Sequence, residues 1–238
     1  MPFFYHFDMT YLVLVLPCLI LAMWASANVN STFKRYSQIY SARRITGAQA
    51  AERVLRENGV FDVRIERVSG HLTDHYDPKT NVIRLSDAVY DSHSVASIGV
   101  ACHEAGHAVQ YAQGYAPIKL RAAIIPITNI GSKLAMPLIL LGLLLRFGEN
   151  YSFGFVYAGI ACFALSLIFQ LVTLPVEFNA SRRAMRCLAG SGTMNESQLK
   201  GAKKVLSAAA MTYVAALAVG LLSLLRLLLI ASRYSRRD

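Results

Sequence analysis

Four long apolar stretches dominate the pattern of hydrophobic and polar positions along this chain, and they cover residues 11–27, 124–147, 153–174 and 205–231. Because a helix needs about 20 largely apolar residues to cross a bilayer, each stretch predicts a transmembrane helix. Asn129 and Lys133 interrupt the second stretch, where a polar side chain either lines a cavity or extends to the interface. Arg226 interrupts the fourth stretch, and its long side chain can reach the interface.

Between the first two stretches, residues 28–123 carry a mixed pattern that predicts a small α+β unit. Its periodicity changes several times between that of a helix and that of a strand. The expected elements are, in order, a helix over 48–57, a half-buried strand over 61–68, a hairpin of 71–76 and 82–85 around a turn at 77–81, and a helix over 95–113.

Polar residues mark the ends of the two helices expected in this unit. Thr46 and Gln49 have the spacing of a capping box at the start of the first helix. Ser92 or Ser94 can cap the second helix, and Gly114 can end it.

The fold class predicted from these patterns is a mainly α membrane protein with about four transmembrane helices and one small α+β unit. The expected division is an N-terminal membrane anchor over 1–27, the α+β unit over 28–123, a two-span membrane hairpin over 124–174, a helix and connector over 175–204, and a last span with its tail over 205–238.

Composition supports a membrane setting and argues against nucleic acid as a partner. Hydrophobic residues make up 55% of the chain and charged residues only 16%. The formal net charge is +10, but its Lys and Arg residues flank the apolar stretches, where they meet anionic headgroups of the lipid bilayer. The four cysteines form no CxxC pair and are read as reduced, packed thiols.

The distribution of basic residues predicts the topology of the spans. Four spans place residues 28–123 and 175–204 on one side, and this side has more Lys and Arg near membrane ends than the other. The positive-inside rule therefore puts it in the cytoplasm of a multi-pass plasma-membrane protein, with the N-terminus outside. A cleaved signal peptide ending at 25–27 is the alternative, but residues 1–10 contain no Lys or Arg.

The sequence His103-Glu104-Ala105-Gly106-His107 has the form H-E-x-x-H inside the second expected helix. Residues i and i+4 share one helix face, so both imidazoles can bind a single zinc ion. Glu104 is offset by one position and can serve as the general base. A helix that merely carries polar residues on one face is the alternative.

A catalytic zinc ion usually takes a third protein ligand, and Glu177 is the best candidate. The chain leaves His107, crosses the membrane twice and returns to the same side just before Glu177, where Pro175 can occupy the first turn of a new helix. A solvated acid at the membrane–water boundary, paired at most with Arg182 or Arg183, is the alternative. The other candidates are His71, Asp74, His75, Asp77, Asp87, Asp91 and His93.

The HEAGH sequence, the two-span hairpin and Glu177-Phe178-Asn179-Ala180-Ser181 together resemble the HtpX and CAAX-prenyl-protease group of membrane gluzincins. That group has Asp where this chain has Ser181, so the support of a ligand histidine differs. Residues 71–78, 114–117 and 174–184 extend a closer resemblance to the YugP-type neutral zinc metallopeptidases of bacteria. This resemblance implies a membrane peptidase and names no substrate.

The function expected from these features is a zincin-like endopeptidase with one zinc ion, acting on a peptide or membrane-protein substrate. Residues 81–85 or 71–76 can supply an edge strand that aligns the substrate, and His75 or Tyr76 can contact the transition state. Turn hydrogen bonds alone are the other interpretation for His71, Asp74 and His75. A non-catalytic zinc-binding scaffold or adaptor, or a hydrolase of non-peptide amides, remains open, and no pattern indicates an oligomeric state.

Overall fold

The structure is a computed structural model that describes residues 9–145 and 151–235. Residues 146–150, in the connection between the second and third predicted spans, lie outside this part of the chain, as do residues 1–8 and 236–238. The chain forms two compact units. The first comprises residues 1–24, 120–173 and 213–238, and the second residues 25–119 and 174–212.

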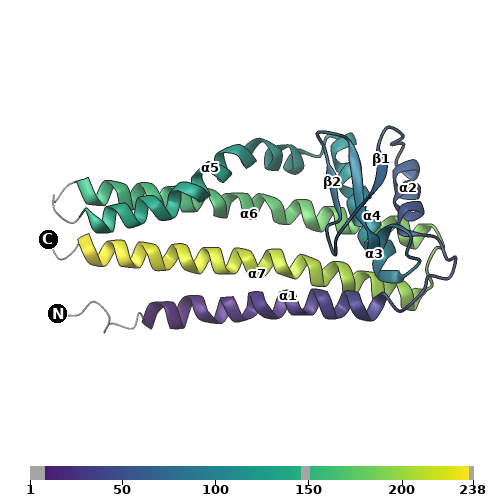
Figure 1. Ribbon diagram of the computed structural model, residues 1–238, viewed down its shortest axis with the longest axis horizontal. Helices are drawn as coiled ribbons and strands as arrows, with labels where there is room; N and C mark the ends of the chain where they lie inside the picture. The colour runs from purple at the N-terminus through teal and green to yellow at the C-terminus, as the bar shows by residue number, and fades with distance from the viewer. Residues whose placement is uncertain (1–8, 146–150, 236–238) are drawn as a thin grey trace. The chain divides into compact units, whose positions relative to one another are not determined.

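Within the described residues, four helical stretches are long and apolar enough to cross a membrane, as the sequence predicted. They lie in α1 (Leu16–Tyr36), which a π-helical turn over Tyr11–Val15 precedes, and in α5 (Ala116–Leu144), α6 (Tyr151–Gly190) and α7 (Glu196–Ser235) (Figure 1).

These helices run past the ends of the apolar stretches, and one expectation is wrong as a result. Pro175 was expected in the first turn of a new helix, but it lies inside α6, which continues to Gly190. The length of an apolar stretch predicts how much of a helix lies in lipid. It does not predict where the helix ends, because the backbone hydrogen bonds can continue into polar sequence. Glu177 therefore stands on the same helix as the third predicted span.

Glycines allow close helix packing within the first unit. A Cβ added to Gly159 of α6 would lie 2.8 Å from the carbonyl oxygen of Ala135 in α5. A Cβ added to Gly131 of α5 would lie 3.1 Å from the carbonyl oxygen of Cys162 in α6. Such close backbone approach is how membrane helices gain packing energy where lipid supplies no hydrophobic driving force.

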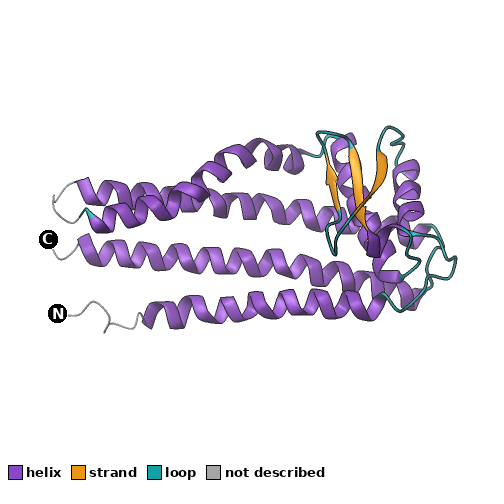
Figure 2. Ribbon diagram, in the orientation of Figure 1, coloured by secondary structure: helices purple, strands orange, loops and turns teal. Residues whose placement is uncertain are grey.

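The second unit contains a three-stranded sheet and short helices (Figure 2). The strand order is β1-β3-β2, with β1 parallel and β2 antiparallel to the central β3. The elements are α2 (Gly47–Glu57), β1 (Arg64–Val68), β2 (His75–Asp77), β3 (Val82–Ser86), α3 (Asp87–Tyr90) and α4 (Val95–Ala112).

The local expectations for this unit are largely confirmed. Thr46 and Gln49 form the capping box of α2, and the Ser94 hydroxyl accepts a hydrogen bond from the Ser97 amide at the start of α4. The hairpin exists, although β2 is shorter than expected. Asp77 closes its turn by accepting hydrogen bonds from the Lys79 amide and the Thr80 hydroxyl, and these lower the pKa of Asp77 to about 2.

The proposed edge strand at 81–85 is wrong. This segment forms most of β3, and both sides of β3 are occupied, by β1 on one side and β2 on the other. The parallel pairing of β1 with β3 was not predicted, because it joins segments that are not neighbours in the hairpin pattern. The open side of β2 is therefore the edge that remains beside the hairpin.

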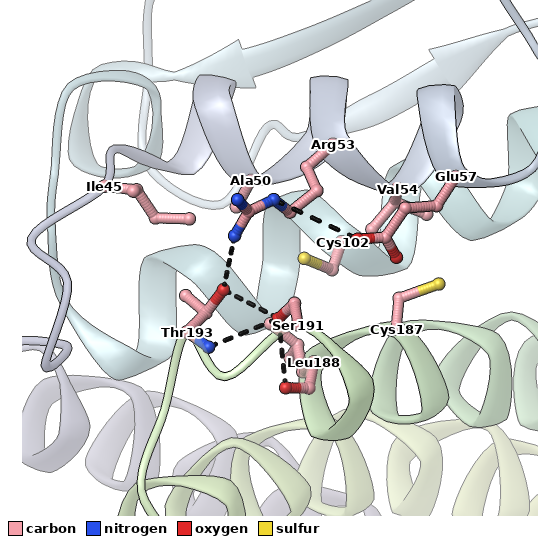
Figure 3. A pocket seen from close by; sticks show the side chains of 10 residues that line it. All are labelled: Ile45, Ala50, Arg53, Val54, Glu57, Cys102, Cys187, Leu188, Ser191 and Thr193. Atoms are coloured by element: carbon pink, nitrogen blue, oxygen red, sulfur yellow. Dashed lines mark hydrogen bonds and ion pairs between the residues drawn. The ribbon is translucent and has the colours of Figure 1, made fainter.

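The core of the second unit holds α4 in place. Val54 of α2, Leu85 of β3 and Ile98 of α4 are all buried in one hydrophobic cluster. Figure 3 shows where α2 approaches the end of α6: the Arg53 guanidinium donates a hydrogen bond to the Thr193 hydroxyl at 3.1 Å. Cys102 of α4 lines the same small cavity, and burial raises the pKa of its thiol.

Candidate metal centre

His103 and His107 lie one turn apart on α4, as the spacing predicted. Their ring centroids are 4.7 Å apart and the rings are nearly perpendicular. His107 is buried and His103 is half-buried. The helix that carries them is largely enclosed by the core, which fixes the direction of both side chains.

Glu177 of α6 converges on the two histidines. Its Oε2 lies 3.2 Å from Nε2 of His103 and 3.5 Å from Nε2 of His107. In a tetrahedral zinc site with bonds near 2.0–2.1 Å, two ligand atoms lie roughly 3.3 Å apart. Among the described residues, these three form the group whose ligand atoms all lie within 4.8 Å of one another. Two imidazoles and one carboxylate are a donor set that suits zinc.

A glycine makes this convergence possible. A Cβ added to Gly106 would lie 2.8 Å from the carbonyl oxygen of Ala180 and 3.2 Å from its Cα, closer than packed atoms tolerate. The backbones of α4 and α6 therefore touch at Gly106 and Ala180. This contact occurs between the two ligand histidines along α4 and one turn beyond Glu177 along α6, so it sets the distance that the ligands must span.

The second nitrogen of each histidine also has a partner. Nδ1 of His107 lies 3.0 Å from Oε1 of Gln110, and Nδ1 of His103 lies 3.1 Å from the Ser181 hydroxyl. An amide oxygen can only accept, so Nδ1 of His107 carries the proton and Nε2 presents its lone pair. The Ser181 hydroxyl can support His103 from α6 as Gln110 supports His107 from α4.

Gln110 belongs to a chain of hydrogen bonds that joins α4 to α6. Its Nε2 donates to the carbonyl oxygen of Val176 at 2.8 Å and to Oδ1 of Asn179 at 3.0 Å. The Arg183 guanidinium donates to the same Asn179 oxygen at 2.7 Å. Sequence reasoning missed Gln110, although a glutamine three positions after His107 on the same helix face was a usable signal.

The charges around His107 favour the binding of a cation to its ring. Burial by itself would lower the pKa of His107, but the hydrogen bond that its protonated ring donates to Glu177 and the charges of Glu104 and Glu177 outweigh burial, so the pKa is raised. The site therefore stabilises a cation on the His107 ring, whether that cation is a proton or a metal ion. The two compete for the same lone pair.

Glu104 is half-buried next to the ligands on α4. Within the described part of the chain its carboxylate makes no hydrogen bond or ion pair, which leaves its oxygens available to a water or substrate. Its charge acts on His107 and also on Asp74. Burial, reinforced by this charge, raises the pKa of Asp74, although two hydrogen bonds from Ser86 oppose the rise.

The other candidate ligands lie elsewhere. The ring of His71 packs against Phe33, and Nδ1 of His75 contacts the Thr73 carbonyl oxygen at 2.8 Å. Asp77 serves the hairpin turn, and Asp87 and Asp91 pair with Arg67. Asp74 binds the backbone and side chain of Ser86, and the backbone oxygen of His93 accepts a hydrogen bond from Ser41. None of these residues joins the metal-binding group among the described residues.

Tyr76 of β2 has a partner for its hydroxyl and a partner for its ring. Its hydroxyl donates a hydrogen bond to Oδ1 of Asn81 at 2.7 Å, and its ring packs against Tyr111 of α4 at 5.6 Å. Burial, with the nearby charges of Tyr111 and two aspartates, raises the pKa of Tyr76 to about 12. The ring contact places β2 next to the helix that carries the histidines.

Comparisons with known proteins extend these observations. A family model described as "Putative neutral zinc metallopeptidase" matches residues 11–232. The "Putative membrane protease YugP" of Bacillus subtilis (strain 168) is 44% identical over 222 residues, which cover 93% of this chain and 96% of the relative. No solved structure gives a significant match to the chain.

Proposed function

Because the chain belongs to the putative neutral zinc metallopeptidase family, we propose that it is a membrane-embedded, zinc-dependent endopeptidase. The observation that carries this proposal is the convergence of His103, His107 and Glu177 beside a glutamate with no other partner among the described residues. A purely structural zinc site is normally closed by four protein ligands, whereas three ligands leave a position for chemistry.

His103, His107 and Glu177 would hold one zinc ion. When bound, zinc supplies Lewis acidity, which polarises the peptide carbonyl and makes a nearby water more acidic. Gln110 and Ser181 keep the two imidazoles turned so that each Nε2 faces the carboxylate of Glu177. A ligand that is already oriented loses less entropy on binding the ion.

Glu104 is the proposed general base. Its carboxylate takes a proton from the attacking water and later donates it to the leaving amine, so that the carbon–nitrogen bond breaks as an amine and an acid form. Position i+1 from His103 places it beside the ligands but on a different part of the helix face. This geometry suits a group that acts on the water rather than on the ion.

The edge of β2 is the proposed guide for the substrate. An extended peptide can pair with an exposed strand edge through main-chain hydrogen bonds. β2 packs close to α4, as the contact between Tyr76 and Tyr111 indicates, and the side of β2 away from β3 pairs with no other described strand. A peptide or membrane-protein segment held there would run along the helix that carries Glu104. His75, which is exposed on this strand, remains a candidate substrate contact.

The proposed location is the plasma membrane, with the α+β unit in the cytoplasm and the N-terminus outside. The excess of Lys and Arg on the side that contains residues 28–123 and 175–204 supports this orientation. The proposed substrates are accordingly membrane or membrane-associated proteins with a segment that is accessible from the cytoplasm.

The decisive experiment compares the Glu104→Gln variant with the wild-type full chain in the same detergent. We expect the variant to keep its zinc, measured by elemental analysis, and to lose cleavage of a membrane-protein substrate by roughly 100-fold or more. Glu52→Gln, which alters an exposed glutamate of α2, should leave cleavage unchanged. Undiminished cleavage by the Glu104→Gln protein would refute the assigned role, and an inactive but zinc-loaded wild type would favour the scaffold alternative.

A further inference from the structure

A basic groove lies within the second unit, outside the candidate metal centre. It has a volume of about 510 Å³ and is formed by one face of α1 and one face of α7. Four cationic side chains, several neutral polar groups and a partly apolar wall line it. The lining includes Arg35 and Tyr36 of α1, and Lys200, Lys203, Lys204 and Ser207 of α7.

The charge of this groove is almost entirely positive. Lys200 pairs with Glu196 at 2.7 Å, so its charge is partly neutralised. No carboxylate oxygen of a described residue lies within 4.0 Å of the charged nitrogens of Arg35, Lys203 or Lys204. Three cations on one groove repel one another, and an anionic ligand would relieve that repulsion.

The wall of the groove is fixed by packing. A Cβ added to Gly201 of α7 would lie 2.6 Å from the ring of Tyr36, so the glycine allows this ring to lie directly against α7. Tyr36 is only 9% exposed and belongs to the core cluster. The groove is thus bounded by packed core on one side and by exposed lysine side chains on the other.

The position of the groove in the sequence indicates the type of anion. Its α1 residues follow directly on the apolar stretch 11–27, and Ser207 lies at the start of the apolar stretch 205–231. Both helices carry the groove where apolar sequence gives way to polar sequence, the depth at which lipid phosphates lie. Its volume falls in the range of small-molecule sites, roughly 300–1,000 Å³.

We propose that this groove binds the headgroup of an anionic phospholipid. The phosphate is held by Lys203, Lys204 and Arg35, and the neutral polar groups of the wall contact the glycerol or headgroup hydroxyls. Basic pockets between helices at a membrane surface bind anionic lipid in this way. The lipid would join α1 to α7, which is a binding function separate from the proposed peptidase.

The test titrates the full chain with phosphatidylglycerol or phosphatidylcholine and counts bound lipid by native mass spectrometry. We expect saturable binding of phosphatidylglycerol and little binding of phosphatidylcholine. The double variant Lys203→Gln/Lys204→Gln should weaken phosphatidylglycerol binding by about tenfold or more. The control Arg56→Gln/Lys79→Gln removes the same charge from exposed positions outside the groove and should bind as the wild type does.

A second variant distinguishes the shape of the groove from its positive charge as the cause of lipid binding. Ser207→Trp keeps every lysine but fills the groove from an exposed position of α7, so it should also reduce phosphatidylglycerol binding. Equal losses in the groove and control double variants would mean diffuse attraction to the membrane and would overturn the proposal. So would inorganic phosphate that displaces the lipid at comparable concentration, because the groove would then be a site for a soluble anion.

Discussion

Gln110 orients the metal ligand His107 without itself belonging to the proposed ligand set. It is fully buried, and its amide is turned by two acceptors on α6, the carbonyl oxygen of Val176 and Oδ1 of Asn179. With both amide hydrogens directed to α6, its oxygen faces His107. The proton on His107 is thereby assigned to Nδ1 by residues that never touch the metal position.

Gln110→Leu should therefore weaken zinc binding by roughly 10- to 100-fold, because it removes the acceptor that orients His107. Gln110→Glu should have a smaller effect, since a carboxylate still accepts from Nδ1. Zinc affinity measured by competition with a chromophoric chelator checks both, and thermal unfolding verifies that each variant is folded. A folded Leu variant with wild-type zinc affinity would show that Gln110 only fills space.

Element packing controls whether the ligands meet at all. The ligand helices α4 and α6 touch where Gly106 faces the backbone of Ala180. Further along α4, Gly99 faces the Cβ of Ala202 on α7, and a Cβ added there would lie at an ordinary contact distance of 3.7 Å. Of these two glycines, only Gly106 lies where a larger side chain would collide with the neighbouring helix.

Gly106→Ala should push α4 and α6 apart, lowering the free energy of unfolding by about 1–3 kcal/mol and reducing zinc content. Gly99→Ala is the matched control, because the new methyl fits and alanine favours the helix by up to about 1 kcal/mol. Thermal unfolding together with metal analysis of both variants checks this. Equal behaviour of the two proteins would contradict the assigned contact.

The elements that sequence predicted correctly are those specified by neighbours along the chain. The capping box at Thr46, the hairpin turn at Asp77 and the pair of histidines on α4 each depend on a few consecutive residues. The central place of β3 and the continuation of α6 through Pro175 depend on distant partners. Local patterns carry no signal for such partners, so both were missed.

The same distinction applies to the candidate site. Glu177 was found because a missing third ligand and the return of the chain to one membrane side narrowed the choice. The network of Gln110, Asn179 and Arg183 was not found, because Gln110 is 69 residues from Asn179 in sequence and only the packing of α4 on α6 brings the two together. The chemistry of zinc narrows the residue types that can be ligands, whereas tertiary packing determines which residues form hydrogen bonds to those ligands.

At the scale of the whole molecule, a metal ion would cross-link segments that are 74 residues apart in sequence, from His103 to Glu177. Zinc at 100 times its Kd should stabilise the folded state by about 2.7 kcal/mol. For a chain of this size that corresponds to a rise in Tm of roughly 5–10 °C. Thermal unfolding with added zinc and with a chelator measures the difference.

Glu177→Gln provides the control for this prediction, because it keeps the volume of the side chain and removes the charge that binds the ion. Its Tm should respond little to zinc or chelator. A zinc-dependent rise as large as that of the wild type would place the ion elsewhere in the molecule, and the ligand set would have to be revised.

The short length of β2 has a consequence for the proteins that the proposed enzyme can process. A three-residue edge accepts only backbone that has released its own hydrogen bonds, so helices and paired strands are excluded whatever their side chains. Selection would then act on conformation: an intact membrane protein would be spared, and the same protein with a frayed or unassembled segment would be cut. Susceptibility to cleavage should follow a client's local unfolding more closely than any consensus around the cut bond.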